Sequence, residues 1–212
     1  MTMANTFVHL RVHSEYSMVD GLVRVKPLIS RVAELGMPAV GLTEQSNMCS
    51  LVRFYKAAMG AGVKPIIGAD IWLENPDEPE TPFRLTLLAR DNDGYLNLTE
   101  IISQGYTEGQ RYGKPIVQKS WLESRAKGLI VLSGAKMGDV GKALLAGKPE
   151  LARERADYWR NLYPDSYYLE LQRTGRAGDE DCLHMSVELA AELGLPVVAT
   201  NDVHFLEADD FE

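Results

Sequence analysis

Residues 39–73, AVGLTEQSNMCSLVRFYKAAMGAGVKPIIGADIWL, contain two strand patterns with a helix pattern between them. Residues 39–43 are short, apolar and β-prone, residues 50–61 have helical spacing and end at Gly62, and residues 64–73 predict a second strand. Strands that are joined through a helix pair in parallel, with a right-handed crossover. This stretch therefore predicts an α/β fold.

The same alternation extends in both directions along the chain. Further strands are predicted at residues 7–13, 84–90, 128–133, 167–173 and 195–202, and helices at 25–35, 93–105, from Trp121, near 138–146, at 149–162 and at 179–193. Residues 75–82 are typical of a Pro-rich turn and residues 109–118 of a loop. Seven such strands either close into a barrel or form an open doubly wound sheet. No repeat or long linker divides the 212 residues, so one domain is expected.

Composition narrows the class of protein further. The chain is 45% hydrophobic and 25% charged, as globular domains are, and its net charge is −8. An acidic chain without a dense basic run is poorly suited to binding nucleic acid unaided, or an anionic membrane surface. No apolar run approaches the ~20 residues that span a bilayer, and the N-terminus has no secretory pattern. Cys49 and Cys182 form no CxxC motif, which favours a reducing, cytoplasmic location.

Polar residues collect just after the predicted strands, where either architecture places its functional side chains. These residues are His13, Glu44, Gln45, Asp70, Ala135, Thr174, Asp202 and His204, with Asp20 in the loop after the first strand. Histidine and aspartate at one barrel mouth are typical of a metal-dependent hydrolase, because imidazole and carboxylate bind divalent cations. A lone Asp-x-His such as Asp202–His204 is more often a hydrogen-bonded loop pair, and the chain has only four histidines.

A glycine-rich stretch, GAKMGDVGK at residues 134–142, raises the question of a phosphate loop. It lacks the GxxxxGK[ST] spacing, since Ala143 follows Gly141-Lys142. The glycines are better explained by a strand-to-helix turn.

Several motifs resemble one family, the polymerase-and-histidinol-phosphatase (PHP) domain. They include FVHLRVHSEYSMVDGL (7–22), GVKPIIGAD (62–70), GLIVLSGAKMGDVGKALL (128–145) and LPVVATNDVHF (195–205). The resemblance covers nearly the whole chain and is to the version that opens the alpha subunit of bacterial replicative DNA polymerase III, of the gamma-proteobacterial type. It implies a distorted seven-stranded (β/α)7 barrel. It also implies that residues 1–212 are a single PHP domain, the N-terminal fragment of a much longer polymerase subunit.

The resemblance also implies a set of metal-ligand positions, since active members hold up to nine ligands in a three-metal phosphoesterase site. The positions that keep a possible ligand are His13, Asp20, Asp70, Asp202 and His204, and the positions that lose one are Arg11, Gln45, Arg84 and Ala135. An arginine is always protonated and offers no lone pair. We therefore expect a vestigial site without metal, in which two arginines offset three aspartates. If one zinc, manganese or magnesium ion is retained, its ligands are His13, Asp20, Asp202 and His204, with Glu44 or Asp70 as base or further ligand.

These residues and the resemblance lead to two main hypotheses on function. The first is a catalytically inactive scaffold in DNA replication that docks the proofreading exonuclease (epsilon) subunit, contacts the rest of the alpha chain, and meets DNA only through the full-length polymerase. The polymerase active site would lie outside this domain. The alternative is a residual metal-dependent phosphoesterase, a pyrophosphatase or 3′–5′ exonuclease. A free-standing phosphatase of the same superfamily is disfavoured by the polymerase-type motifs.

Overall fold

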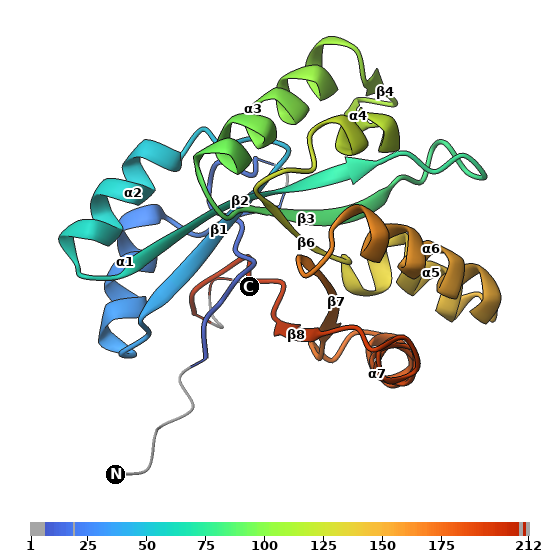
Figure 1. Cartoon of the computed structure of the whole chain (residues 1–212). Coiled ribbons are helices and arrows are strands. Elements are labelled where there is room, and N and C mark those ends of the chain that lie inside the picture. The colour runs from blue at the N-terminus through green and yellow to red at the C-terminus, as the bar shows by residue number, and fades with distance from the viewer. Residues whose placement is uncertain (1–6, 19, 208–209, 211–212) are drawn as a thin grey trace.

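The computed structural model describes residues 7–18, 20–207 and 210, and it has the predicted α/β character (Figure 1). The helices are α1 (Val25–Glu34), α2 (Leu51–Gly60), α3 (Asn92–Thr107), α4 (Lys119–Ser124), α5 (Asp139–Leu145), α6 (Pro149–Leu162) and α7 (Asp179–Leu193), with a short 3-10 turn η1 (Ala135–Met137). The strands are β1 (Ala39–Gln45), β2 (Lys64–Leu73), β3 (Phe83–Ala89), β4 (Gln110–Arg111), β5 (Lys114–Val117), β6 (Leu129–Leu132), β7 (Tyr167–Gln172) and β8 (Val197–Thr200). Helices lie around the outside of the sheet.

The predicted strand–helix–strand unit is present. β1 pairs in parallel with β2, from Ala39 opposite Lys64 to Gln45 opposite Asp70. The sheet continues in the order β4-β5-β2-β3-β6-β7-β8, and β6, β7 and β8 pair in parallel. The register places Asp70 beside the end of β1, so residues after these strands meet at one end of the sheet.

Three of the described strand pairs are antiparallel, namely β2–β3, β3–β6 and β4–β5, and pairing through helices does not predict them. β2 and β3 are joined by the Pro-rich turn, not by a helix, so the chain reverses and β3 returns alongside β2. β6 then pairs with β3 in the antiparallel sense although helices separate them in sequence. The rule that strands joined through helices pair in parallel therefore does not hold for β3 and β6.

The segment at residues 7–13, which the alternating pattern predicts to be a strand, does not form a regular strand in the structure. Val12 makes an isolated parallel bridge to Val203, and the His13 N–H donates to the Val203 carbonyl at 2.9 Å. On its other side the segment accepts from β1, where Gly41 N–H donates to the His9 carbonyl at 2.6 Å. The segment thus lies between β1 and the residues after β8. A second difference is the predicted loop at 109–118, which holds the short β4–β5 hairpin.

The core has two parts. The larger one packs β2, β3, β6 and β7 against α3, α5 and α6, with Trp159 fully buried and its indole N–H donating to Asp139. The smaller one lies under α1 and α2, around Phe54. Gly138 serves a tight turn, because a Cβ there would lie 1.7 Å from the Ser133 carbonyl oxygen. Within the described ranges no helix is long and apolar enough to cross a membrane.

Candidate functional site

The guanidinium of Arg11 lies at the centre of a buried charged cluster. Its Nε donates to Asp70 Oδ2 at 2.7 Å, and its Nη1 donates to Glu170 Oε1 at 3.4 Å. Asp202 Oδ1 lies 3.6 Å from the same Nε. Arg11 is only 1% exposed, so a buried cation lies among three carboxylates, which come from β2, β7 and the segment after β8.

Arg84, on β3, is the second arginine of the cluster. Its Nη2 donates to Gln45 Oε1 at 2.8 Å and to Asp70 Oδ2 at 3.3 Å, and lies 3.8 Å from Asp20 Oδ2. The guanidinium also lies over the Trp72 ring, 5.3 Å from its centroid. Two positions that the resemblance assigns to lost ligands, Gln45 and Arg84, therefore contact each other.

His13 connects two aspartates. Its Nδ1 is 3.0 Å from Asp20 Oδ1 and its Nε2 is 2.9 Å from Asp70 Oδ2. Burial alone would lower the pKa of His13, but the hydrogen bonds to Asp20 and Asp70 outweigh it and raise the pKa to about 9. At neutral pH the ring is therefore an imidazolium, and both of its N–H groups donate to carboxylates.

This raised pKa predicts a pH dependence of stability. Because the folded-state pKa lies above the unfolded value of about 6.5, the contribution of His13 is complete below pH 6.5 and is lost as pH rises through about 9. We expect the free energy of unfolding to fall by about 3 kcal/mol across that range. Urea unfolding at several pH values measures the loss, and an NMR titration of the His13 ring should have its midpoint near 9. The exposed His184 is the internal control, and a His13 midpoint near 6.5 would contradict the assignment.

The aspartates of the cluster are held in their ionised form. Burial alone would raise the pKa of Asp70, but Arg11 and then His13 keep it well below the usual range, and the Thr86 hydroxyl donates to its second oxygen. The pKa of Asp202 is also lowered against burial, chiefly by its hydrogen bond to His204. Stability from both groups is present above pH 3.8 and is lost only as pH falls well below it.

Other predicted site residues lie apart from this cluster. Glu44 is buried, and its carboxylate accepts from the Ser14 N–H at 3.0 Å and from the hydroxyls of Ser17 at 2.6 Å and Ser50 at 2.8 Å. It thus orders the 14–17 loop and is not placed to act as a base or ligand beside His13. Ala135 is buried with φ at +46° in η1 and contributes no polar side-chain atom.

Glu170 is the site residue that sequence reasoning missed. Its carboxylate accepts from Arg11, from the Gly134 N–H at 3.0 Å, from Gln172 at 2.9 Å and from the Thr200 hydroxyl. It lies inside β7, before the strand end, so a search of strand ends passes over it. The available signal was a carboxylate between two leucines of a strand, because such a group is rarely buried without a partner. Arg176, whose Nη1 donates to Asp202 Oδ2 at 2.9 Å, was also missed.

The ionic groups of the cluster balance formally. The carboxylates are Asp20, Asp70, Glu170 and Asp202, and the cations are Arg11, Arg84, Arg176 and the protonated His13. A divalent cation would add positive charge to groups that are already neutralised. This donor set therefore does not fit a centre of several metal ions.

One smaller group could offer ligands to a single ion. Donor atoms of His13, Asp20 and His204 all lie within 4.8 Å of one another. In the structure, however, both His13 nitrogens are engaged with carboxylates, and His204 Nδ1 is 3.0 Å from the Asp20 carbonyl oxygen. Binding an ion here requires that His13 lose its proton, so the trio fits a metal poorly near neutral pH.

Comparison with known families assigns the fold. Residues 9–174 match the family described as the PHP domain, which is well over half of the chain. The chain belongs to the PHP domain family. The expected resemblance is thereby confirmed.

Relatives of this PHP domain are subunits of a bacterial polymerase. It is 55% identical over 210 residues to DNA polymerase III subunit alpha of Pseudomonas aeruginosa and 50% identical over 206 residues to that of Escherichia coli K12. The corresponding subunit of Haemophilus influenzae is 41% identical over 212 residues. These matches cover 97–100% of this chain but only 18% of each relative.

Solved structures support the fold at low sequence identity. An amidohydrolase from Chromobacterium violaceum, with bound sulfate and no metal, superposes with a TM-score of 0.59 at 12% identity, over 93% of this PHP domain and 87% of that chain. A two-domain protein from Bacteroides vulgatus, containing a predicted PHP-like metal-dependent phosphoesterase, gives 0.57 at 15% identity, over 93% and 51%. Both neighbours agree with a PHP-like α/β fold.

Proposed function

We propose that this PHP domain is a catalytically inactive scaffold within a replicative DNA polymerase III alpha subunit. The observation that carries the proposal is the position of Arg11, whose buried guanidinium contacts Asp70, Glu170 and Asp202. A permanently charged side chain that fills the centre of the carboxylate cluster substitutes for metal charge and leaves no Lewis acid to activate water.

Several residues support loss of phosphoester hydrolysis beyond Arg11. Arg84 brings a second guanidinium to Asp70, and protonated His13 has no free lone pair. Glu44, the remaining candidate for a general base, has its oxygens occupied by serine donors. General-base catalysis needs a carboxylate or imidazole that is free to accept a proton from water.

The place of the domain in replication rests on its relatives. The matched subunits are polymerase alpha chains, and this chain spans about 18% of their length. We infer that residues 1–212 form the PHP domain of such a chain in the cytoplasm, with DNA contacted through the remaining polymerase domains. The domain keeps its buried charged cluster and two packed cores, so it can serve as a stable binding platform without catalysis. We propose that the proofreading exonuclease (epsilon) subunit is the partner that it binds.

Metal content tests the inactivity. After incubation with zinc and manganese and removal of free ions by dialysis, elemental mass spectrometry should find close to zero ions per chain, because arginine and imidazolium already neutralise the carboxylates. Two or more ions per chain would contradict the proposal. Isothermal titration with purified exonuclease subunit tests the docking part separately, and absence of binding at tens of micromolar would contradict that part.

The second candidate is a residual phosphoesterase, favoured by the His13–Asp20–His204 trio. One zinc, manganese or magnesium ion there would supply a polarised water for hydrolysis of pyrophosphate or a DNA 3′ end. The test is activity before and after Asp202→Ala, which removes the partner of His204 Nε2 at 3.0 Å. Activity that is lost with Asp202 supports this candidate, whereas equal activity in both proteins indicates a contaminant.

A further inference from the structure

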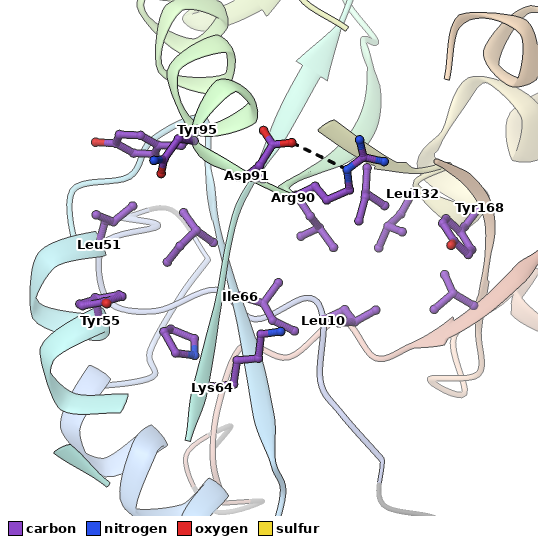
Figure 2. Close-up of a pocket in the computed structure, with 17 residues that line it drawn as sticks. Leu10, Leu51, Tyr55, Lys64, Ile66, Arg90, Asp91, Tyr95, Leu132 and Tyr168 are labelled. Atoms are coloured by element: carbon purple, nitrogen blue, oxygen red, sulfur yellow. Dashed lines mark ion pairs between the residues drawn. The ribbon is translucent and has the colours of Figure 1, made fainter. Parts of the chain in front are cut away.

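A cavity of about 730 Å³ opens at the end of the sheet opposite the charged cluster (Figure 2). On β2, Lys64 and Ile66 line the cavity, whereas Asp70, further along the same strand, belongs to the cluster. On β7, Tyr168 lines the cavity and Glu170 reaches Arg11. The cavity is therefore separate from the site described above.

The walls of this cavity are mainly apolar. They include Leu10, Ile66, Leu88, Ile130 and Leu132, from the N-terminal segment and three neighbouring strands. Figure 2 shows Leu10, Ile66 and Leu132 around an open centre between α2 and the β6–β7 side. Its size is within the range of ligand and anchor pockets, and open apolar surface of this kind marks binding sites.

An apolar stripe on two helices continues the cavity onto the surface. On α2, Val52, Tyr55 and Met59 lie on one face by helical spacing, and on α3 Tyr95 and Leu96 lie near the helix start. These five side chains are between 39% and 62% exposed, and the two tyrosines also line the cavity. A small molecule would fill the cavity and leave the stripe in water, whereas a polypeptide segment would cover both.

Positively charged side chains at the cavity and on α2 indicate which kind of polypeptide segment would bind there. Lys56 and Lys64 have no carboxylate within ion-pair distance among the described residues, and Arg90 has only a 3.9 Å contact to Asp91. The ammonium of Lys64 points along the wall beside Ile66. On a chain of net charge −8, this local excess of unpaired positive charge is complementary to acidic side chains.

We propose that the cavity and the helix stripe, together called the α2–α3 docking surface, bind an acidic, amphipathic segment of a separate protein. The segment inserts apolar side chains into the cavity and places carboxylates beside Lys56 and Lys64. This inference rests on the proposed docking function and names the surface and recognition chemistry of the docked partner. Tyr55 is expected to be an anchor, because tyrosines that become buried on binding often contribute much of the binding energy of an interface.

The test uses purified exonuclease subunit as the probe and isothermal titration as the measurement. Tyr55→Ser, and separately the pair Lys56→Glu and Lys64→Glu, should each raise the Kd at least tenfold. The matched controls are Tyr112→Ser, at an exposed tyrosine of the β4–β5 turn, and Lys148→Glu, at an exposed lysine before α6, and both should leave the Kd within twofold. All the replaced side chains are exposed, so the variants should remain folded.

The outcomes separate the inference from the proposed function. If wild type binds and the surface variants bind equally well, the docking surface is wrong while the docking function stands. If wild type does not bind, the proposed partner is wrong, and photo-crosslinking decides the surface. With p-benzoylphenylalanine in place of Leu96 in the full-length protein in cells, mass spectrometry should find attachment to an acidic segment of another chain. Attachment to a second copy, to the same chain or to nothing would overturn the inference.

Discussion

Replacement of Arg11 with alanine is expected to lower the free energy of unfolding by about 3–5 kcal/mol. The substitution leaves the buried carboxylates of Asp70 and Glu170 without their central cation, while the side chain that is lost was only 1% exposed. A loss of this size is a large fraction of the total stability of an ordinary domain, about 5–15 kcal/mol. Urea unfolding followed by circular dichroism measures it.

Two further variants make this measurement decisive. Arg176→Ala removes another arginine that contacts Asp202, but its side chain is 55% exposed, so the loss should stay below about 1 kcal/mol. If Arg11→Ala alone fails to fold, the pair Arg11→Ala and Glu170→Gln should recover folding, because Arg11 is the cation that pairs with Glu170 among the described residues and its loss leaves that buried charge unpaired. Equal midpoints for wild type and Arg11→Ala would show that Arg11 does not neutralise this cluster.

Restoring histidine at three positions together is expected to convert the cluster into a zinc site. The combination Arg11→His, Gln45→His and Arg84→His removes both guanidiniums near Asp70 and supplies imidazole ligands. We expect at least one zinc ion per chain by elemental mass spectrometry, against close to zero for wild type. Saturating zinc should also raise the stability of the combined variant, by about 2.7 kcal/mol at a concentration one hundred times the Kd.

The single variants are the controls for this result. Arg84→His alone leaves Arg11 bound to Asp70 at 2.7 Å, and Arg11→His alone leaves Arg84 at 3.3 Å. In each case one guanidinium still repels a cation, so neither single variant should hold zinc after dialysis. Zinc retained by either single variant as firmly as by the combination would contradict the account of the charge balance.

The fold was predictable where local pattern and tertiary pairing agree. The β1–α2–β2 unit shows its strand patterns and its helical spacing in the sequence, and its strands have the expected parallel pairing. β3 is antiparallel to β2 because the predicted turn at residues 75–82, and not a helix, joins the two strands, so the chain reverses direction. At Val12 the alternating pattern is present, but the segment makes isolated bridges and single hydrogen bonds to β1 instead of a continuous ladder, and sequence periodicity does not report how many pairing partners are available.

The site was predictable where charge chemistry and strand ends coincide. The carboxylate of Asp70 contacts both Arg11 and His13, and the pairing of an aspartate with arginine was predicted from the residue types. The strand-end position of Glu44 does not reveal that hydroxyl donors occupy its carboxylate, Ser17 from the distant 14–17 loop and Ser50 from just before α2. Glu170 was missed because its partner Arg11 is 159 residues away in sequence, and only the three-dimensional fold brings the two together.

That separation between Arg11 and Glu170 also determines when the charged cluster can form during protein synthesis. At about 5–20 residues per second, a ribosome needs roughly 8–30 seconds to add the intervening 159 residues. Throughout that interval Glu170, Asp202 and Val203 have not been added to the chain, so Arg11 cannot form its contacts to the two carboxylates and Val12 cannot pair with Val203. The nascent domain therefore completes its ionic centre only after almost all of its sequence has been translated.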